Sequence, residues 1–174
     1  MKNTKRIDGF VEFSVVKKGV IGIVSDIPYR IAQDEVNIVC SELDWDKDNG
    51  KAMNVNSSGP GNILFAILEY ENICQIFTGF GQRGVPLQKV AENVVLQVKK
   101  YLYSTAPVGR YLADQLLIPM SLSGKGSFCT TGITEHAFTN IEIIKKFLDI
   151  NIHYQKNSKN TFEINIEGDR YEMD

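Results

Sequence analysis

The segment Leu87-Gln-Lys-Val-Ala-Glu-Asn-Val-Val-Leu-Gln-Val-Lys-Lys-Tyr-Leu102 decides the fold of the first half of this chain. Its apolar residues recur at three- and four-residue spacing, which is the period of one helix face. These residues are Leu87, Val90, Ala91, Val94, Val95, Val98 and Leu102. We therefore predict a helix from Pro86 to Tyr103 whose valine face packs onto a sheet that contains Ile63 to Leu68.

The residues before this helix predict the sheet and a second helix. Pro28 to Leu43 carries its apolar residues on one helical face. Asn62 to Tyr70 is apolar on both faces, which fits a strand covered on both sides, and Cys74 to Phe80 is its predicted partner.

Two further segments complete this half. Val11 to Val15 and Val20 to Val24 indicate a hairpin around the turn signal Lys17-Lys-Gly19. Asp44 to Gly61 is rich in Asp, Asn, Gly and Ser, so we predict a loop.

The second half predicts a helix, a strand, a helix and two strands after a boundary at Thr105 to Gly109. The first helix covers Tyr111 to Leu122, and Pro119 is expected to bend or end it. The second helix is expected to begin at a capping box, Thr139-Asn-Ile-Glu142. The predicted strands are Ser127 to Thr131, Ile150 to Lys156 and Thr161 to Glu167.

Composition limits the function classes. The chain has 174 residues, 19 basic against 21 acidic, so no overall charge would hold it on nucleic acid or on an acidic membrane. It contains neither a membrane-length apolar run nor a signal peptide, which indicates no membrane and a cytoplasmic location. We predict that all three cysteines, Cys40, Cys74 and Cys129, are core thiols and that none belongs to a metal site.

The two histidines differ in their predicted surroundings. His153 lies on the polar side of its strand, so we expect it to face solvent. His136 lies between the strand that ends at Thr131 and the helix predicted at Thr139, near a helix N-terminus that favours phosphate. Neutral imidazole could attack a phosphorus atom there, although the spacing alone favours a structural loop histidine.

Five segments together resemble the C-terminal part of the RNA 3'-terminal phosphate cyclases, in order and in spacing. They are Gly59-Pro-Gly-Asn62, Val98-Lys-Lys-Tyr-Leu-Tyr-Ser-Thr105, Val108-Gly-Arg-Tyr-Leu-Ala-Asp-Gln-Leu-Leu-Ile-Pro-Met120, Gly124-Lys-Gly-Ser-Phe128 and His136-Ala-Phe-Thr-Asn-Ile-Glu142. The resemblance covers most of the chain from about Gly19 to Leu148.

This resemblance implies a reaction and a set of site residues. In the family, ATP adenylylates a histidine, AMP moves to an RNA 3'-phosphate end, and the 2'-hydroxyl displaces AMP to leave a 2',3'-cyclic phosphate. His136 has the place of the nucleophile, and Tyr111, Asp114 and Gln115 match the segment around the adenine and ribose. ATP and a divalent metal, Mg or Mn, are the implied cofactors, with no metal ligand expected in this chain.

The resemblance also implies an α/β (α+β) architecture. Residues 10–105 would form a small inserted α/β domain, and residues 106–168 the last βαβαββ repeat, which resembles the C-terminal domain of translation initiation factor three. Residues 1–9 and 169–174 would be tails. The first strand of the repeat and the family's N-terminal repeats have no counterpart in the sequence, so we expect those repeats, or a second copy of the chain, as a partner.

Two other function classes remain open at this point. The chain could be a non-catalytic cyclase-like protein of ribosome assembly, although those proteins lack the adenylylated residue and His136 is present. It could also be an α/β interaction module without catalysis.

Overall fold

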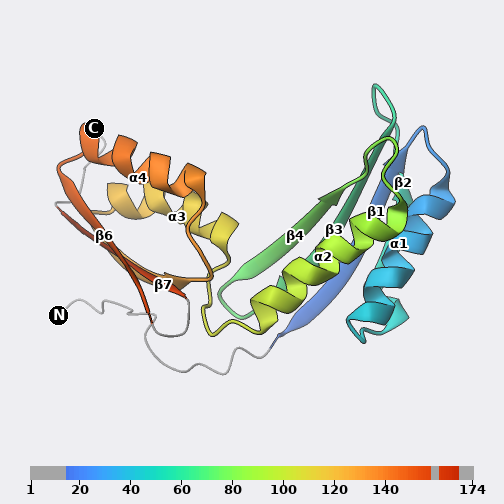
Figure 1. Cartoon of the computed structure of the whole chain (residues 1–174), viewed down its shortest axis with the longest axis horizontal. Helices are drawn as coiled ribbons and strands as arrows, with labels where there is room; N and C mark the ends of the chain where they lie inside the picture. Colours follow the sequence, from blue (N-terminus) through green and yellow to red (C-terminus); the bar gives the residue numbers. More distant parts are fainter. Residues whose placement is uncertain (1–14, 158–160, 169–174) are drawn as a thin grey trace. The chain divides into compact units, whose positions relative to one another are not determined.

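The computed structural model describes residues 15–157 and 161–168, which form a mixed α and β fold with two sheets and four α-helices (Figure 1). These residues form two compact units, one within Ser14–Tyr103 and one within Ser104–Asp174. Positions 11–14 of the predicted first strand and both predicted tails lie outside the described residues.

The first unit is a four-stranded sheet with the strand order β2-β1-β3-β4. Both helices of this unit lie on the same face of the sheet (Figure 1). Strand β1 pairs antiparallel with β3 and parallel with β2, and β3 pairs antiparallel with β4. In chain order the elements are β1 (Lys17–Ser25), α1 (Tyr29–Glu42), the short helix η1 (Lys47–Asn49), β2 (Gly50–Asn54), β3 (Gly61–Glu69), β4 (Cys74–Phe80) and α2 (Leu87–Leu102).

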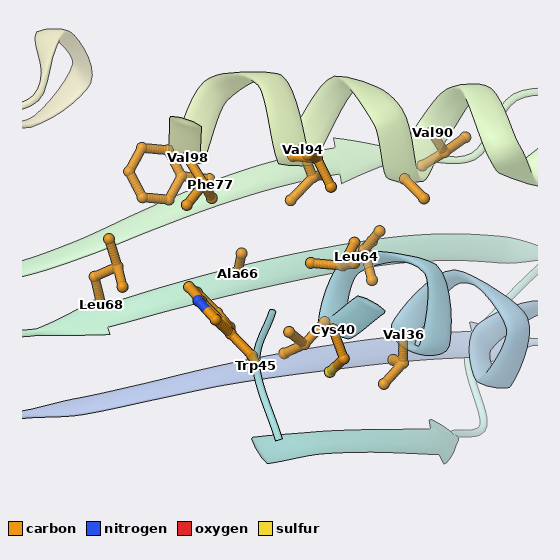
Figure 2. Packing of buried hydrophobic residues seen from close by; sticks show 14 of the residues in the cluster. Val36, Cys40, Trp45, Leu64, Ala66, Leu68, Phe77, Val90, Val94 and Val98 are labelled. Atoms are coloured by element: carbon orange, nitrogen blue, oxygen red, sulfur yellow. The ribbon is translucent and has the colours of Figure 1, made fainter. Parts of the chain in front are cut away.

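Helix α2 packs its valine face onto the sheet, as the apolar spacing predicts. Figure 2 shows Val90, Val94 and Val98 directed toward the strands, where Leu64 and Leu68 of β3 meet them. All five of these side chains are buried. Burying one such side chain contributes about 1.5–3 kcal/mol, so this contact is a large part of the unit's stability.

Trp45 extends the same core beneath α1. It is 8% exposed, and its backbone amide donates to the carbonyl of Cys40 at 2.9 Å. The ammonium group of Lys18 lies 5.6 Å from the centre of a Trp45 ring, close enough for a cation–π contact. Helix α1 and the chain that follows it are therefore fixed to the sheet through a large aromatic side chain (Figure 2).

Two predictions for this unit are wrong. Lys17-Lys-Gly19 is no turn, because β1 pairs with β3 from Lys17 opposite Glu69 to Ser25 opposite Gly61. The predicted loop at Asp44 to Gly61 contains β2, an edge strand without regular apolar alternation whose pairing comes from β1 and not from its own pattern.

The prediction that β3 is covered on both sides is also only half right. Leu64, Ala66 and Leu68 are buried beneath the helices, whereas the alternate residues Ile63, Phe65 and Ile67 are half-buried.

The cysteine prediction holds for Cys40 alone, which is buried beneath α1. Burial, with a smaller contribution from the charge of Asp46, raises the pKa of the Cys40 thiol. Cys129 is half-buried and Cys74 is exposed, since Cys74 begins a strand at the edge of the sheet. The apolar character of the flanking residues gave no information about this edge position.

The second unit is a three-stranded antiparallel sheet with the order β5-β7-β6 and two helices that pack on each other and on the strands. In chain order the elements are α3 (Arg110–Leu122), β5 (Lys125–Thr130), α4 (Glu135–Phe147), β6 (Ile150–Lys156) and β7 (Phe162–Gly168). Helix α3 continues to Leu122, so Pro119 does not end it. The largest fully buried side chains here are Leu117, Phe128, Ile141, Ile152, Ile164 and Ile166.

A single residue stands where the first strand of a βαβαββ repeat would lie. Val108 forms a parallel bridge with Thr130 at the edge of β5. Its amide donates to the carbonyl of Cys129 at 3.2 Å, and its carbonyl accepts from the amide of Thr131 at 2.9 Å. Among the described residues of the second unit, this bridge is the one strand-like pairing that comes before α3.

No helix in the described part of the chain is long and apolar enough to cross a membrane.

Candidate functional site

Helix α4 begins five residues earlier than the sequence predicts. Thr134 is its N-cap, and the Thr134 hydroxyl accepts a 3.0 Å hydrogen bond from the amide of Ala137. Thr139, the predicted cap, lies inside the helix and donates to the carbonyl of Glu135 at 2.9 Å. Thr134 provides the same capping chemistry right after β5, so the predicted capping box is wrong.

This earlier start places His136 in the first turn of α4, where its side chain is exposed. The first backbone amides of a helix have no partner within the helix, and the helix dipole adds partial positive charge there. Thr134 accepts from the amides of Ala137 and Phe138, so an anion beside His136 would meet the amides of Glu135 and His136.

A hydrogen bond between α3 and α4 brings Asp114 close to His136. Nδ2 of Asn140 donates to Oδ1 of Asp114 at 2.6 Å, and both residues are half-buried. Asn140 follows His136 by four residues, so their Cβ atoms are roughly 5–6 Å apart on one side of α4. Asp114 of α3 thus contacts the residue that lies one helical turn after His136 on α4.

Tyr111 and Gln115 lie beside Asp114 on α3. Tyr111 precedes Asp114 by three residues and Gln115 by four, which are the spacings of neighbours on a helix surface. Tyr111 is 55% exposed, and Gln115 is exposed as well. The exposed Tyr111 ring can therefore lie flat against a planar ligand.

Arg110 contacts the candidate residue Tyr111, and sequence reasoning missed it. Its Nη2 donates to the hydroxyl of Tyr111 at 2.8 Å, and its guanidinium carbon lies 4.7 Å from the centre of that ring. Its backbone amide donates to the hydroxyl of Thr131 at 3.1 Å, which fixes the start of α3 to the end of β5. Arg110 places a positive charge beside the Tyr111 ring.

Asn140 is the other missed residue, and its spacing from His136 was a usable signal. The predicted cap at Thr139 hid this signal, because it placed the start of the helix after His136 and left His136 outside the helix. His153 lies on β6 opposite Asn165 and is exposed, as predicted.

The described residues do not fit a metal ion. Among them, no group of three or more His, Cys, Asp or Glu side chains could hold one.

The cap assignment gives a direct prediction. Thr134→Ala should lower the free energy of unfolding by about 1 kcal/mol, because it removes the acceptor for the amide of Ala137. Thr139→Ala is the matched control and should cost less, since alanine is the better residue inside a helix. Urea denaturation of the two variants measures the difference, and a larger loss for Thr139→Ala would contradict the observed cap.

Comparisons with known proteins find one family and its members. A family model described as RNA 3'-terminal phosphate cyclase matches residues 6–154. The chain is 38% identical over 134 residues to the RNA 3'-terminal phosphate cyclase of Ralstonia nicotianae, which covers 77% of this chain and 38% of that protein. The cyclase of Ectopseudomonas mendocina is 37% identical over 75% of this chain and 38% of its own length, and that of Koribacter versatilis 34% identical over 86% and 42%. The chain thus spans about two fifths of the curated relatives it matches.

Proposed function

Because the chain belongs to the RNA 3'-terminal phosphate cyclase family, we propose that it takes part in converting an RNA 3'-phosphate to a 2',3'-cyclic phosphate with ATP. His136 is the residue that becomes adenylylated. The observation that supports this proposal is the hydrogen bond from Asn140 to Asp114, because Asn140 lies one turn after His136 on the same helix and so links α3 to the helix that carries His136.

The proposed reaction has three transfers. A neutral imidazole nitrogen of His136 attacks the α-phosphorus of ATP, an N–P bond forms, and the P–O bond to pyrophosphate breaks. An oxygen of the RNA 3'-phosphate then attacks the same phosphorus, and the N–P bond breaks. Finally the 2'-hydroxyl attacks the 3'-phosphorus, loses its proton and releases AMP.

The residues of this chain bind and orient the nucleotide. Tyr111 lies against the adenine, since its ring is exposed and held by Arg110. Oδ1 of Asp114 accepts a hydrogen bond from Asn140, and Oδ2 accepts one from a sugar hydroxyl. Gln115 offers a side-chain amide beside Asp114. The free amides of the first turn of α4 stabilise charge on the phosphate as His136 attacks.

We propose that the remaining groups come from a partner. The divalent metal and the cationic groups that neutralise pyrophosphate would be supplied by the family's N-terminal repeats or by a second copy of this chain. Without them a lone histidine loses much of the electrostatic stabilisation that phosphoryl transfer needs, so the chain alone should react slowly.

Intact mass spectrometry tests the first transfer. After incubation with ATP and Mg²⁺ or Mn²⁺, we expect a fraction of the chain to gain one AMP group, and the fraction should rise when the N-terminal part of a related cyclase is added. Removing the adduct with acid, to which a phosphoramidate is labile, checks its chemistry. No adduct, even with the N-terminal part present, would contradict adenylylation of this chain.

A further inference from the structure

Glu35 is a fully buried carboxyl group in the first unit, whereas the residues proposed for the reaction belong to the second unit. It lies in α1 on the face that packs against the sheet. Its Oε1 accepts a 2.7 Å hydrogen bond from Nδ2 of Asn62, the second residue of β3. A buried carboxyl group therefore links α1 to a central strand.

Two oxygen atoms of this pair have no hydrogen-bond partner among the described residues. They are Oε2 of Glu35 and Oδ1 of Asn62, and both are buried. With the carboxyl group ionised, both atoms can only accept, so neither can satisfy the other. Interior polar groups without partners are rare and costly, which makes two in one pair an arrangement that needs an explanation.

A single proton on Oε2 supplies the missing donor. A protonated carboxyl group and a carboxamide each have a donor and an acceptor, so the two groups can exchange two hydrogen bonds. We infer that Glu35 is held as the neutral acid and donates from Oε2 to Oδ1 of Asn62, forming a proton-dependent clamp between α1 and β3. This Glu35–Asn62 clamp is independent of the reaction proposed at His136.

The surroundings of Glu35 favour its neutral form. Burial raises the pKa of Glu35 above its ordinary value of 4.5, and the hydrogen bond from Asn62 opposes this rise without cancelling it. The other buried titratable groups on α1 and α2 are Cys40 and Tyr101, whose pKa values burial also raises, so both stay uncharged near neutrality.

The charged groups around α1 lie nearer to solvent than Glu35 does. Within α1, Arg30 pairs with Asp34, and Glu42 pairs with Lys99 of α2, each at 3.4 Å. The elements that pack against α1 are β1, β2, β3, η1 and α2. Their charged side chains are exposed or half-buried, and they are Lys17, Lys18, Lys47, Asp48, Lys51, Glu69, Lys89, Glu92, Lys99 and Lys100.

The clamp makes the stability of the first unit depend on pH. A folded-state pKa above the unfolded value of 4.5 means that its stabilisation is complete below pH 4.5 and is lost as pH rises through the folded-state pKa. Over that window the unfolding equilibrium constant should rise by up to about tenfold per pH unit from this one proton. Loss of the proton would also remove the hydrogen bond that Asn62 accepts from Glu35. The backbone carbonyl of Asn62 accepts from the amide of Gly81 at 2.9 Å, so the end of β4 would be affected as well.

Glu35→Gln tests the clamp, because glutamine offers the same acceptor and a permanent donor in place of the proton. Urea denaturation is measured from about pH 5 to about pH 9 for the wild-type chain, Glu35→Gln and the control Glu42→Gln, which changes an exposed carboxyl group of the same helix. We expect the wild-type chain and Glu42→Gln to lose stability relative to Glu35→Gln as pH rises. Parallel pH profiles for all three proteins would overturn the clamp.

A second measurement on the wild-type chain decides the question even if Glu35→Gln does not fold. The ¹³C chemical shift of the Glu35 carboxyl carbon distinguishes the acid from the carboxylate. The neutral-acid shift at about pH 6, where an ordinary glutamate is ionised, is the expected result. The carboxylate shift at that pH would overturn the proposal.

Discussion

Val94→Asp should unfold the first unit. Val94 is 0% exposed and faces the sheet from the middle of α2, so the substitution removes an apolar contact and places an ionised carboxyl group in the core. The two effects together should lower the free energy of unfolding by about 4 kcal/mol or more, a large part of what a domain of this kind possesses. Circular dichroism during thermal denaturation, with limited proteolysis, measures the loss.

Leu96→Asp is the matched control for this substitution. Leu96 lies two residues away on the same helix, is 66% exposed, and should tolerate the same change with little loss. Val94 is also sensitive to substitution because it is closely packed against β4. A Cβ atom built on Gly79 of β4 would lie only 2.7 Å from Cγ2 of Val94. Equal melting temperatures for Val94→Asp and the wild-type chain would contradict the packing of α2.

His136→Ala should abolish labelling by α-labelled ATP, because the proposed nucleophile is removed while the helix is kept. The exposed His136 side chain contributes little to packing, so the variant should fold as the wild-type chain does. Acid-labile label is counted on the purified chain after denaturation, with the N-terminal part of a related cyclase present to raise the signal. The expected loss is complete within the sensitivity of the method.

His153→Ala is the control for this experiment, since His153 is the other histidine of the chain and lies exposed on β6. It should keep wild-type labelling. Label that persists in His136→Ala, or that disappears equally in both variants, would contradict His136 as the adenylylated residue.

Elements with strong hydrophobic periodicity were predictable from the sequence, and those defined by pairing were not. The seven apolar positions of α2 left one helical interpretation, and the alternation in β6 and β7 indicated two strands. Strand β2 carries no such pattern, because an edge strand acquires its conformation from the backbone of β1. The predicted turn at Lys17-Lys-Gly19 failed because pairing with β3 overrides a weak local turn preference.

The candidate site was predictable in its residues but not in its supporting contacts. Motif spacing selected His136, Tyr111, Asp114 and Gln115, whose roles stay predictions. Their supports are contacts between elements: Asn140 of α4 with Asp114 of α3, and the amide of Arg110 with Thr131 after β5. A linear pattern does not contain these distances. The choice between Thr134 and Thr139 as the cap likewise depended on where β5 ends.

Trp45 gives the first unit its own spectroscopic signal. It is the one tryptophan of the chain and belongs to the core beneath α1 and α2, whereas the second unit contains tyrosines such as Tyr111 and Tyr154. Emission excited at the red edge of indole absorption therefore follows only the melting of the first unit, while far-ultraviolet ellipticity follows both. Coincident midpoints from the two signals would mean that the units unfold as one cooperative system, and separate midpoints would assign a stability to each unit from a single sample.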